Sequence, residues 1–415
     1  MWNKRIAITG VGIVSPIGIG KTAYWKALRE GQSGIKPITL FNSDPYKVKL
    51  AGEASLFDPG KNFSKKELIY FDRATMLLLT ASKSALGDAQ ITINDENTHD
   101  IGVAIGTTFG SLQSLSEFDK ESVNEGPQFV NPSHFPNAVA NLPASQVSIY
   151  FKIKGFNVTV STGMCASLDA IDFAIKAIQY HGRKIVVTGT VEEMCEHTFL
   201  GFYKLRALSG CENGEIPISC PFDQRRNGII FSEGSGAIIL EDFEYAKNRG
   251  ARVYAEILSI ASNFDPFRLN RYNPRGTGMV EVMELALSKA HLTPRDIDYI
   301  CANANSTYDA DLIETQAIRQ VFGDRAYEIP VSSIKSMIGE TYSAAGCLSA
   351  IASIGAMQND FVPPTINYIF KDPQLDLDFV VNTSRELSVN TIMINSFGQN
   401  GANSSLIIKK TDRTL

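Results

Sequence analysis

The chain has 415 residues, a formal net charge of −5 and 44% hydrophobic residues, so it can bury large cores. The acidic balance argues against a broad nucleic-acid-binding or anionic-membrane surface. Six cysteines without a C-x-x-C pair or metal-like spacing predict free thiols in a reducing compartment, with no metal and no cofactor. No apolar run approaches the ~18 residues of a membrane span, and the N-terminus lacks a cleavage pattern, so we expect a cytoplasmic protein.

Short apolar, β-branched runs alternate along the chain with segments of helical periodicity. In chain order the runs predict strands over 5–9, 101–106, 157–160, 184–189, 235–241, 253–260, 298–302, 391–395 and 404–409. Helical spacing predicts helices over 22–29, 72–89, 166–180, 277–290, 311–321 and 343–358. This alternation predicts an α/β fold with mostly buried sheets. A polar segment at 245–252 predicts a boundary between two halves of comparable architecture, 1–250 and 251–415.

Cys165 lies in the segment 158–178, VTVSTGMCASLDAIDFAIKAI, between the end of a predicted strand and the start of a predicted helix. Free backbone N–H groups and the positive end of a helix dipole stabilise a thiolate at such a place. Cys165 is therefore a candidate nucleophile with a lowered pKa. A free cysteine is more often a small buried packing residue, and this segment by itself leaves both interpretations open.

Six segments in order carry a resemblance that covers essentially the whole chain. They read ITGVGIVSPIG (8–18), STGMCASLDAI (161–171), PFDQRRNGIIFSEGSGAIILE (221–241), SSIKSMIGETYSAAG (332–346), PPTINY (363–368) and NSFGQNGANSSLI (395–407). Together they resemble the β-ketoacyl-acyl carrier protein synthases, the condensing enzymes of fatty-acid and polyketide synthesis. The resemblance implies a thiolase-like fold of two pseudo-symmetric halves in α-β-α-β-α layers, dimerised through the strand before the nucleophile. It also implies that Cys165 is the cysteine that accepts the acyl chain.

The chain departs from this family at both active-site histidines, which polarise the malonyl thioester carbonyl and stabilise the enolate formed as carbon dioxide leaves. The first histidine position is Asn303, within CANANSTYDADLIETQAI (301–318), and the second is Glu340, while Lys335 is retained. Asn303 keeps an amide donor for an oxyanion hole. Glu340 has three open interpretations: an ionised group that repels the enolate, a carboxyl kept protonated by burial, or the ion-pair partner of Lys335.

A third departure concerns the C-terminal glycine loop, where the family has NSFGFGG with a phenylalanine that gates the acyl pocket. Here the loop reads NSFGQNG, so Gln399 takes the gate position, Asn400 follows it, and Phe397 is retained. The resemblance makes these three residues candidates for substrate binding, at a pocket mouth that is more polar than in the family.

Three functions are compatible with this pattern. The first, which the retained cysteine favours, is acyl transfer through a Cys165 thioester without efficient decarboxylative condensation. The second is a non-catalytic partner subunit, like the chain-length factors that pair with an active ketosynthase. The third is condensation with an atypical Cys-Asn-Glu site. The resemblance implies an acyl carrier protein with a phosphopantetheine-borne acyl group as a partner, and either a homodimer or a heterodimer with a complete ketosynthase.

Overall fold

The computed structural model describes residues 4–132, 134–212 and 215–411. Its main sheet has eleven strands in the order β11-β10-β14-β15-β9-β1-β8-β7-β5-β6, with β2 paired to β1 beside this path. These strands are β1 (Ile6–Ser15), β2 (Gly18–Ile19), β5 (Ile101–Gly106), β6 (Asn157–Val160), β7 (Ile185–Glu192), β8 (Gly234–Asp242), β9 (Ala255–Phe264), β10 (Tyr299–Cys301), β11 (Val331–Ser332), β14 (Thr391–Phe397) and β15 (Ala402–Lys410). Two small sheets pair β3 (Ile35–Pro37) with β4 (Leu50–Gly52) and β12 (Phe361–Val362) with β13 (Arg385–Glu386).

The strand order repeats on the two sides of the β1–β9 pair. From β1 outward the order is β8, β7, β5, β6, and from β9 outward it is β15, β14, β10, β11. On each side the first two pairings are antiparallel and the last two are parallel. The two sets join through antiparallel pairing of β1 with β9, in which Ile6 lies opposite Ile257. The predicted pseudo-symmetric arrangement is therefore confirmed.

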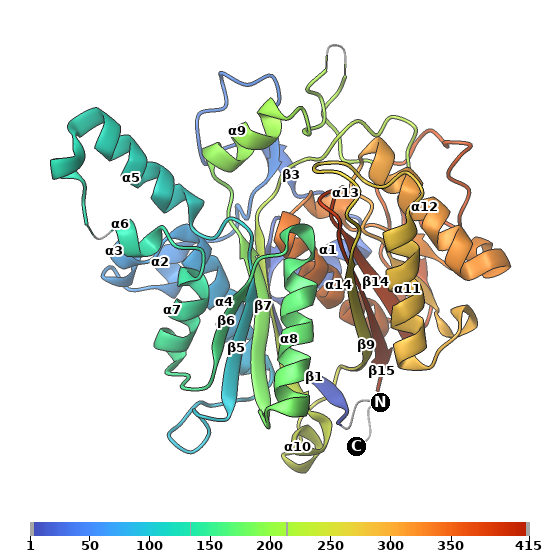
Figure 1. Cartoon of the computed structure of the whole chain (residues 1–415), viewed down its shortest axis with the longest axis horizontal. Helices are drawn as coiled ribbons and strands as arrows, with labels where there is room; N and C mark the ends of the chain where they lie inside the picture. Colours follow the sequence, from blue (N-terminus) through green and yellow to red (C-terminus); the bar gives the residue numbers. More distant parts are fainter. Residues whose placement is uncertain (1–3, 133, 213–214, 412–415) are drawn as a thin grey trace.

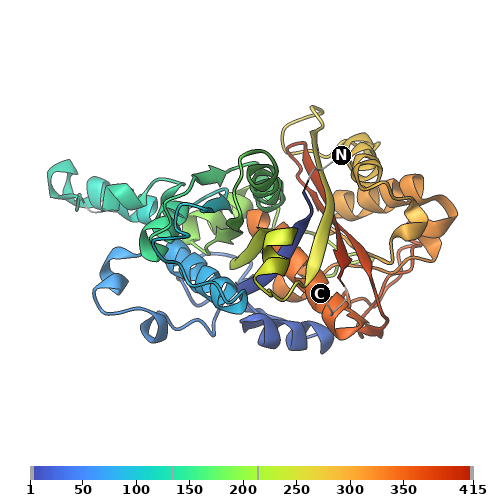
Figure 2. The ribbon, with the colours of Figure 1, turned by 90° about the horizontal axis from the view of Figure 1, so that it is seen from below.

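Long helices cover the sheet in three groups (Figures 1 and 2). On the outer side of the first set of strands lie α4 (Arg73–Asp88) and α7 (Leu142–Phe151), and on the outer side of the second lie α11 (Thr277–Ala290) and α12 (Tyr308–Phe322). Between the two sets lie α8 (Ala166–Tyr180) and α14 (Ala345–Asn359). The remaining helices are α1 (Lys21–Arg29), α2 (Pro59–Asn62), α3 (Glu67–Tyr70), α5 (Leu112–Glu125), α6 (His134–Asn137), α9 (Glu196–Lys204), α10 (Phe243–Asn248) and α13 (Lys335–Ile338).

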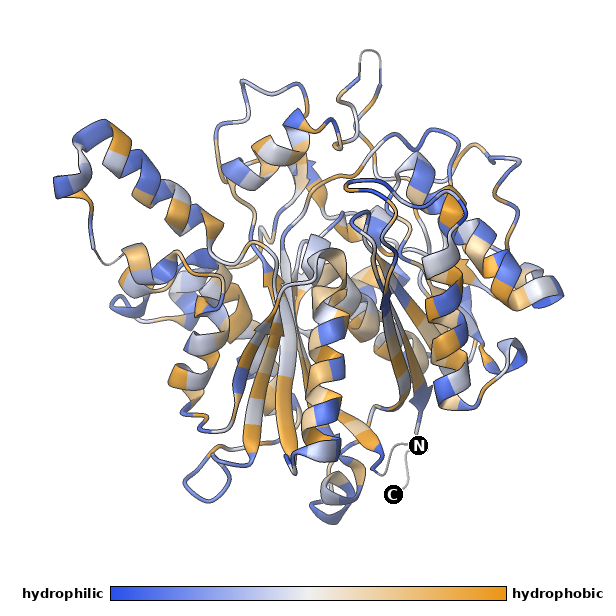
Figure 3. Ribbon diagram, in the orientation of Figure 1, coloured by the Kyte–Doolittle hydropathy of each residue, from blue (hydrophilic) through white to orange (hydrophobic). Residues whose placement is uncertain are grey.

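The apolar faces predicted from the sequence are buried in a hydrophobic core at the centre of the molecule. The apolar face of α8, Leu168, Ile171, Ile175 and Ile178, is buried together with residues of α14 and of strands from both sets. Apolar residues follow the strands inside the helical layers, whereas the exposed helix faces are polar (Figure 3). All nine predicted strands and all six predicted helices are present. Among the described residues, no helix is long and apolar enough to span a membrane.

Two equivalent turns place the candidate site at one end of the sheet. Helix α8 is preceded by the 3₁₀ turn η2 (Gly163–Cys165), and α14 is preceded by the 3₁₀ turn η5 (Tyr342–Ala344). The carboxyl end of β14 lies beside η2, where the hydroxyl of Ser396 donates to the carbonyl oxygen of Met164 at 2.9 Å, and β10 is the parallel neighbour of β14. The segment predicted as a boundary, 245–252, includes the last residues of α10 and lies between β8 and β9, which both pair with β1.

Candidate active site

Cys165 ends the turn η2 and is fully buried at the start of α8. Its Sγ donates to the carbonyl oxygens of Ser396, at 3.1 Å, and Ala402, at 3.2 Å. Although Cys165 is the N-cap residue of α8, its side chain makes no capping hydrogen bond. Burial, and secondarily the charge of Asp169, raise its pKa to about 12. The expected lowering of this pKa is therefore wrong, because full burial of the sulfur disfavours the charged thiolate.

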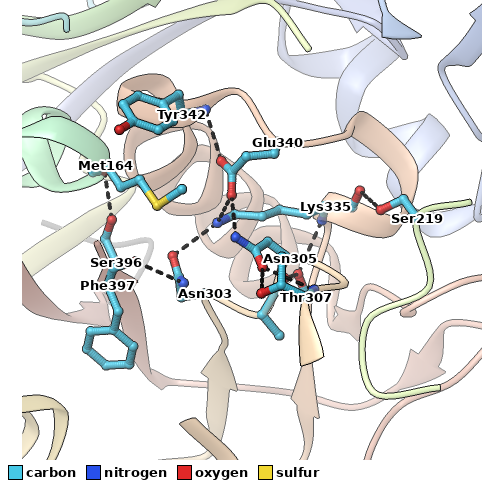
Figure 4. Close-up of polar contacts among 12 residues, drawn as sticks. Met164, Ser219, Asn303, Asn305, Thr307, Lys335, Glu340, Tyr342, Ser396 and Phe397 are labelled. Atoms are coloured by element: carbon cyan, nitrogen blue, oxygen red, sulfur yellow. Dashed lines mark hydrogen bonds and ion pairs between the residues drawn. The ribbon is translucent and has the colours of Figure 1, made fainter. Parts of the chain in front are cut away.

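Lys335 and Glu340 form an ion pair in the interior of the site. The Lys335 Nζ lies 2.8 Å from the Glu340 Oε2, and the two side chains are only 3% and 1% exposed. Glu340 Oε2 also accepts from the Nδ2 of Asn305 at 3.1 Å, and Oε1 accepts from the backbone N–H of Tyr342 at 2.9 Å. Of the three interpretations of Glu340, the structure shows the ion pair (Figure 4).

Asn303 extends this network from the end of β10. Its Oδ1 accepts from the Lys335 Nζ at 3.0 Å, and its Nδ2 donates to the carbonyl oxygen of Phe397 at 3.2 Å. The backbone N–H of Asn303 donates to Glu314 on α12 at 2.9 Å. Burial raises the pKa of Glu314 to about 7. The amide of Asn303 therefore has protein partners on both its oxygen and its nitrogen.

The C-terminal loop contributes to the site mainly through its backbone. The ring of Phe397 is fully buried in the hydrophobic core beside α11 and α12 and points away from the Lys335–Glu340 pair (Figure 4). Gln399 is partly exposed and lines a cavity of about 260 Å³. The exposed Asn400 accepts through its Oδ1 from the backbone N–H of Asn270 at 3.2 Å. Hydrogen bonds thus join four of the candidate residues, Asn303, Lys335, Glu340 and Phe397. Cys165 bonds to the carbonyl of Ser396, the neighbour of Phe397, and Gln399 and Asn400 follow in the same loop.

Two tyrosines of the site were missed by the sequence analysis. Tyr342 follows Glu340 by two residues, has φ 51°, and contacts the rings of Phe109 and Phe202 at centroid distances of 5.2 and 5.5 Å. Tyr272 lies in the loop after β9, and its hydroxyl donates to the Phe397 carbonyl at 3.3 Å. Burial raises the pKa of Tyr342 to about 12 and raises that of Tyr272 well above its usual value. Tyr342 could have been identified from the sequence, because it lies two residues after the candidate Glu340. No local sequence pattern identifies Tyr272 as a site residue.

Glu192 supports the site from the end of β7. This fully buried carboxylate accepts hydrogen bonds from the backbone N–H of Thr108 and from the hydroxyl of Ser343 in η5. Burial raises its pKa to about 7. Glu192 thereby ties the loop that carries Phe109 to the turn that carries Tyr342. Within the described residues, no group of three or more His, Cys, Asp or Glu side chains is arranged to hold a metal ion.

Comparisons with known proteins give consistent results over the whole chain. Residues 3–246 match the β-ketoacyl synthase N-terminal domain, and residues 254–369 match the β-ketoacyl synthase C-terminal domain. The chain is 34% identical over 411 residues to 3-oxoacyl-[acyl-carrier-protein] synthase 2 of Coxiella burnetii, with 99% of each chain covered. It is 36% identical over 409 residues to the enzyme of the same name from Synechocystis sp., with 98% of each covered.

Solved structures show the same fold. The ishigamide ketosynthase/chain length factor matches with a TM-score of 0.92 and 30% identity, covering 99% of this chain and 100% of that one. A type II polyketide ketosynthase, solved in complex with its acyl-carrier protein, matches with a TM-score of 0.90 and 28% identity, covering 98% and 100%. A β-ketoacyl synthase from Burkholderia phymatum matches with a TM-score of 0.89 and 29% identity, covering 99% and 100%. These matches confirm the predicted thiolase-like fold.

Proposed function

Since the chain belongs to the β-ketoacyl synthase family, we propose that it is the non-condensing partner subunit of a complete ketosynthase acting on carrier-protein-bound acyl chains. The observation that carries this proposal is the buried Lys335–Glu340 ion pair at the position of the second family histidine. The sequence by itself favoured acyl transfer, and the geometry of the site shifts the preference to the partner subunit.

The ion-pair network opposes decarboxylation for two reasons. First, Glu340 places a carboxylate where the family has a neutral donor, and Lys335, which neutralises it, is engaged by Glu340 and Asn303. Second, the Nδ2 of Asn303 already donates to the Phe397 carbonyl. Losing one oxyanion donor typically costs about 3–4 kcal/mol in the transition state, or roughly 10²–10³ in rate. Losing two donors would leave little rate enhancement for condensation.

The state of Cys165 also argues against turnover at this site. Acyl transfer from a carrier protein requires the thiolate as the nucleophile. The hydrogen bonds of the Cys165 Sγ go to two carbonyl oxygens, which are acceptors and cannot remove its proton. Its raised pKa, about 12, leaves very little thiolate at neutral pH.

The surface of the chain offers a place for a partner subunit. Strand β6 lies at the end of the main sheet and has partly exposed residues, and within the described part of the chain its one strand partner is β5. Such an open edge is a template for pairing with a strand of another chain. Helix α5 projects from the body of the protein (Figures 1 and 2), and the apolar residues Val123, Phe129 and Phe135 are exposed. We take the partner to be a complete ketosynthase because a homodimer would contain two closed sites.

Acyl transfer remains the second candidate, because Cys165 is retained at the start of α8. In that case Cys165 would become acylated by an acyl carrier protein and would pass the acyl group to another acceptor. The structure would then have to open around the sulfur before transfer.

The test uses the full chain with a Cys-His-His ketosynthase from the same organism. We expect a one-to-one complex in native mass spectrometry that releases carbon dioxide from malonyl carrier protein, while the chain alone releases no more than its Cys165→Ala variant. Release by the chain alone that depends on Asn303 would overturn the proposal in favour of condensation. A stable acyl adduct on Cys165 after incubation of the chain with acyl carrier proteins, absent in Cys165→Ala, would favour acyl transfer.

A further inference from the structure

We propose that Tyr342 is a barrier between the 260 Å³ cavity at the mouth of the site and the sulfur of Cys165. This inference deepens the proposed function, because it explains how a retained cysteine is kept out of reach of acyl thioesters.

The cavity approaches Cys165 but does not include it. Its lining combines the aromatic residues Phe109, Phe202 and Tyr342 with Gln399 of the C-terminal loop. Beyond Gln399, Gly398 adjoins the residue that precedes Cys165, since a Cβ at position 398 would lie 3.8 Å from the Cβ of Met164. The Tyr342 ring and the Met164 side chain lie next to each other in Figure 4 and belong to one hydrophobic cluster. Tyr342 therefore stands on the side of the cavity that faces the cysteine.

The ring is fixed in this position by its aromatic neighbours. It packs against Phe109 at a centroid distance of 5.2 Å and against Phe202 at 5.5 Å, and the residue is only 7% exposed. Phe202 in turn contacts Phe231 at 5.0 Å. A side chain packed on several sides by other rings cannot leave its place without disturbing the cluster.

The backbone of Tyr342 is held in an uncommon conformation. Its φ of 51° lies in the left-handed region, which a bulky side chain adopts only when surrounding contacts impose it. Two buried carboxylates supply such contacts: Glu340 accepts from the N–H of Tyr342, and Glu192 accepts from the hydroxyl of Ser343. Glu340 thus has a positioning role for the barrier in addition to its ion pair with Lys335.

The experiment measures access to Cys165 in the full chain by iodoacetamide labelling and peptide mass spectrometry. Tyr342→Gly removes the ring, and glycine tolerates the left-handed backbone without strain. We expect Cys165 in this variant to be labelled at least about tenfold faster than in the wild type, because labelling no longer requires a local opening. Tyr342→Phe is the matched control, since it keeps the ring and loses only the hydroxyl, and its rate should equal that of the wild type.

Two buried cysteines, Cys301 and Cys347, report on general loosening within the same sample. Their slow labelling should be unchanged in Tyr342→Gly. Tyr342→Asn, whose smaller side chain tolerates the left-handed region, repeats the test should the glycine variant fold poorly. The proposal would be overturned if Cys165 in a folded Tyr342→Gly or Tyr342→Asn variant were labelled at the wild-type rate. It would also be overturned if Tyr342→Phe raised the labelling rate equally, or if the labelling rates of Cys301 and Cys347 rose in parallel. This measurement needs neither a partner subunit nor a carrier protein, so its outcome is independent of the partner-subunit proposal. Either proposal can therefore fail while the other stands.

Discussion

Replacing Glu340 with glutamine should destabilise the fold strongly, because the substitution leaves the ammonium of Lys335 buried without its counter-charge. Lys335 is only 3% exposed and lies 2.8 Å from Glu340. Breaking a buried ion pair by removing one partner typically costs about 3–5 kcal/mol. A domain of this kind is usually stable by only about 5–15 kcal/mol, so the substitution removes a large share of the total.

The hydrogen bonds of Glu340 argue for a cost within this range. Its Oε2 accepts from Lys335 and Asn305, and its Oε1 accepts from the backbone N–H of Tyr342. Glutamine has one carbonyl oxygen and one NH₂ group, so in either orientation its NH₂ faces at least one donor. An unsatisfied buried donor costs roughly 1–3 kcal/mol by itself.

The assay is urea unfolding monitored by far-ultraviolet circular dichroism, with the slope m compared between variants. The matched control is Asp172→Asn, which breaks the exposed Lys176–Asp172 pair and should cost less than about 1 kcal/mol. Lys335→Met combined with Glu340→Gln should be less destabilised than the sum of the single variants, by about 2 kcal/mol. A cost below about 1 kcal/mol for Glu340→Gln at unchanged m would refute the buried ion pair as we describe it.

Three further predictions follow from buried groups. Cys165 should react with iodoacetamide more slowly than the partly exposed Cys211, because burial raises its pKa to about 12; faster labelling of Cys165 would contradict the closed site. Burial raises the pKa of Glu193 to about 8, so the native state binds more protons than the unfolded state between about pH 4.5 and 8. The free energy of unfolding should therefore fall as pH rises through this window, by at most about 1.4 kcal/mol per pH unit, and urea titrations should show a flatter profile for Glu193→Gln. Gly12→Ala should destabilise by more than about 2 kcal/mol, since the added Cβ would lie 1.9 Å from a backbone oxygen of α4, whereas Gly87→Ala, with open space around it, should be neutral or slightly stabilising in thermal melts.

Apolar periodicity in the sequence predicted most of the long elements and the faces that they bury. A helix that repeats apolar residues at Leu168, Ile171, Ile175 and Ile178 must bury that side, and all four side chains are buried. The apolar runs that became β5 and β6 were predicted with the bounds that the structure shows. Helices α5, α7 and α9 were missed. The polar α5 projects from the body and buries only Ser114 and Ser116, which leaves it no apolar stripe.

The hydrogen bonds and charges of the site, in contrast, depend on contacts between distant parts of the chain. Cys165 was placed correctly at a strand–helix junction, yet its sulfur faces the Ser396 and Ala402 carbonyls, which come from a hairpin more than 200 residues away. The sequence left three interpretations of Glu340 open. The ionisation of its carboxyl group, its burial and its ion-pair partner depend on how the interior packs, which a local motif does not specify. Residues 303, 335 and 340 meet only when β10 and the segment before α14 pack together, so their hydrogen bonds, and therefore the function that they permit, depend on long-range contacts.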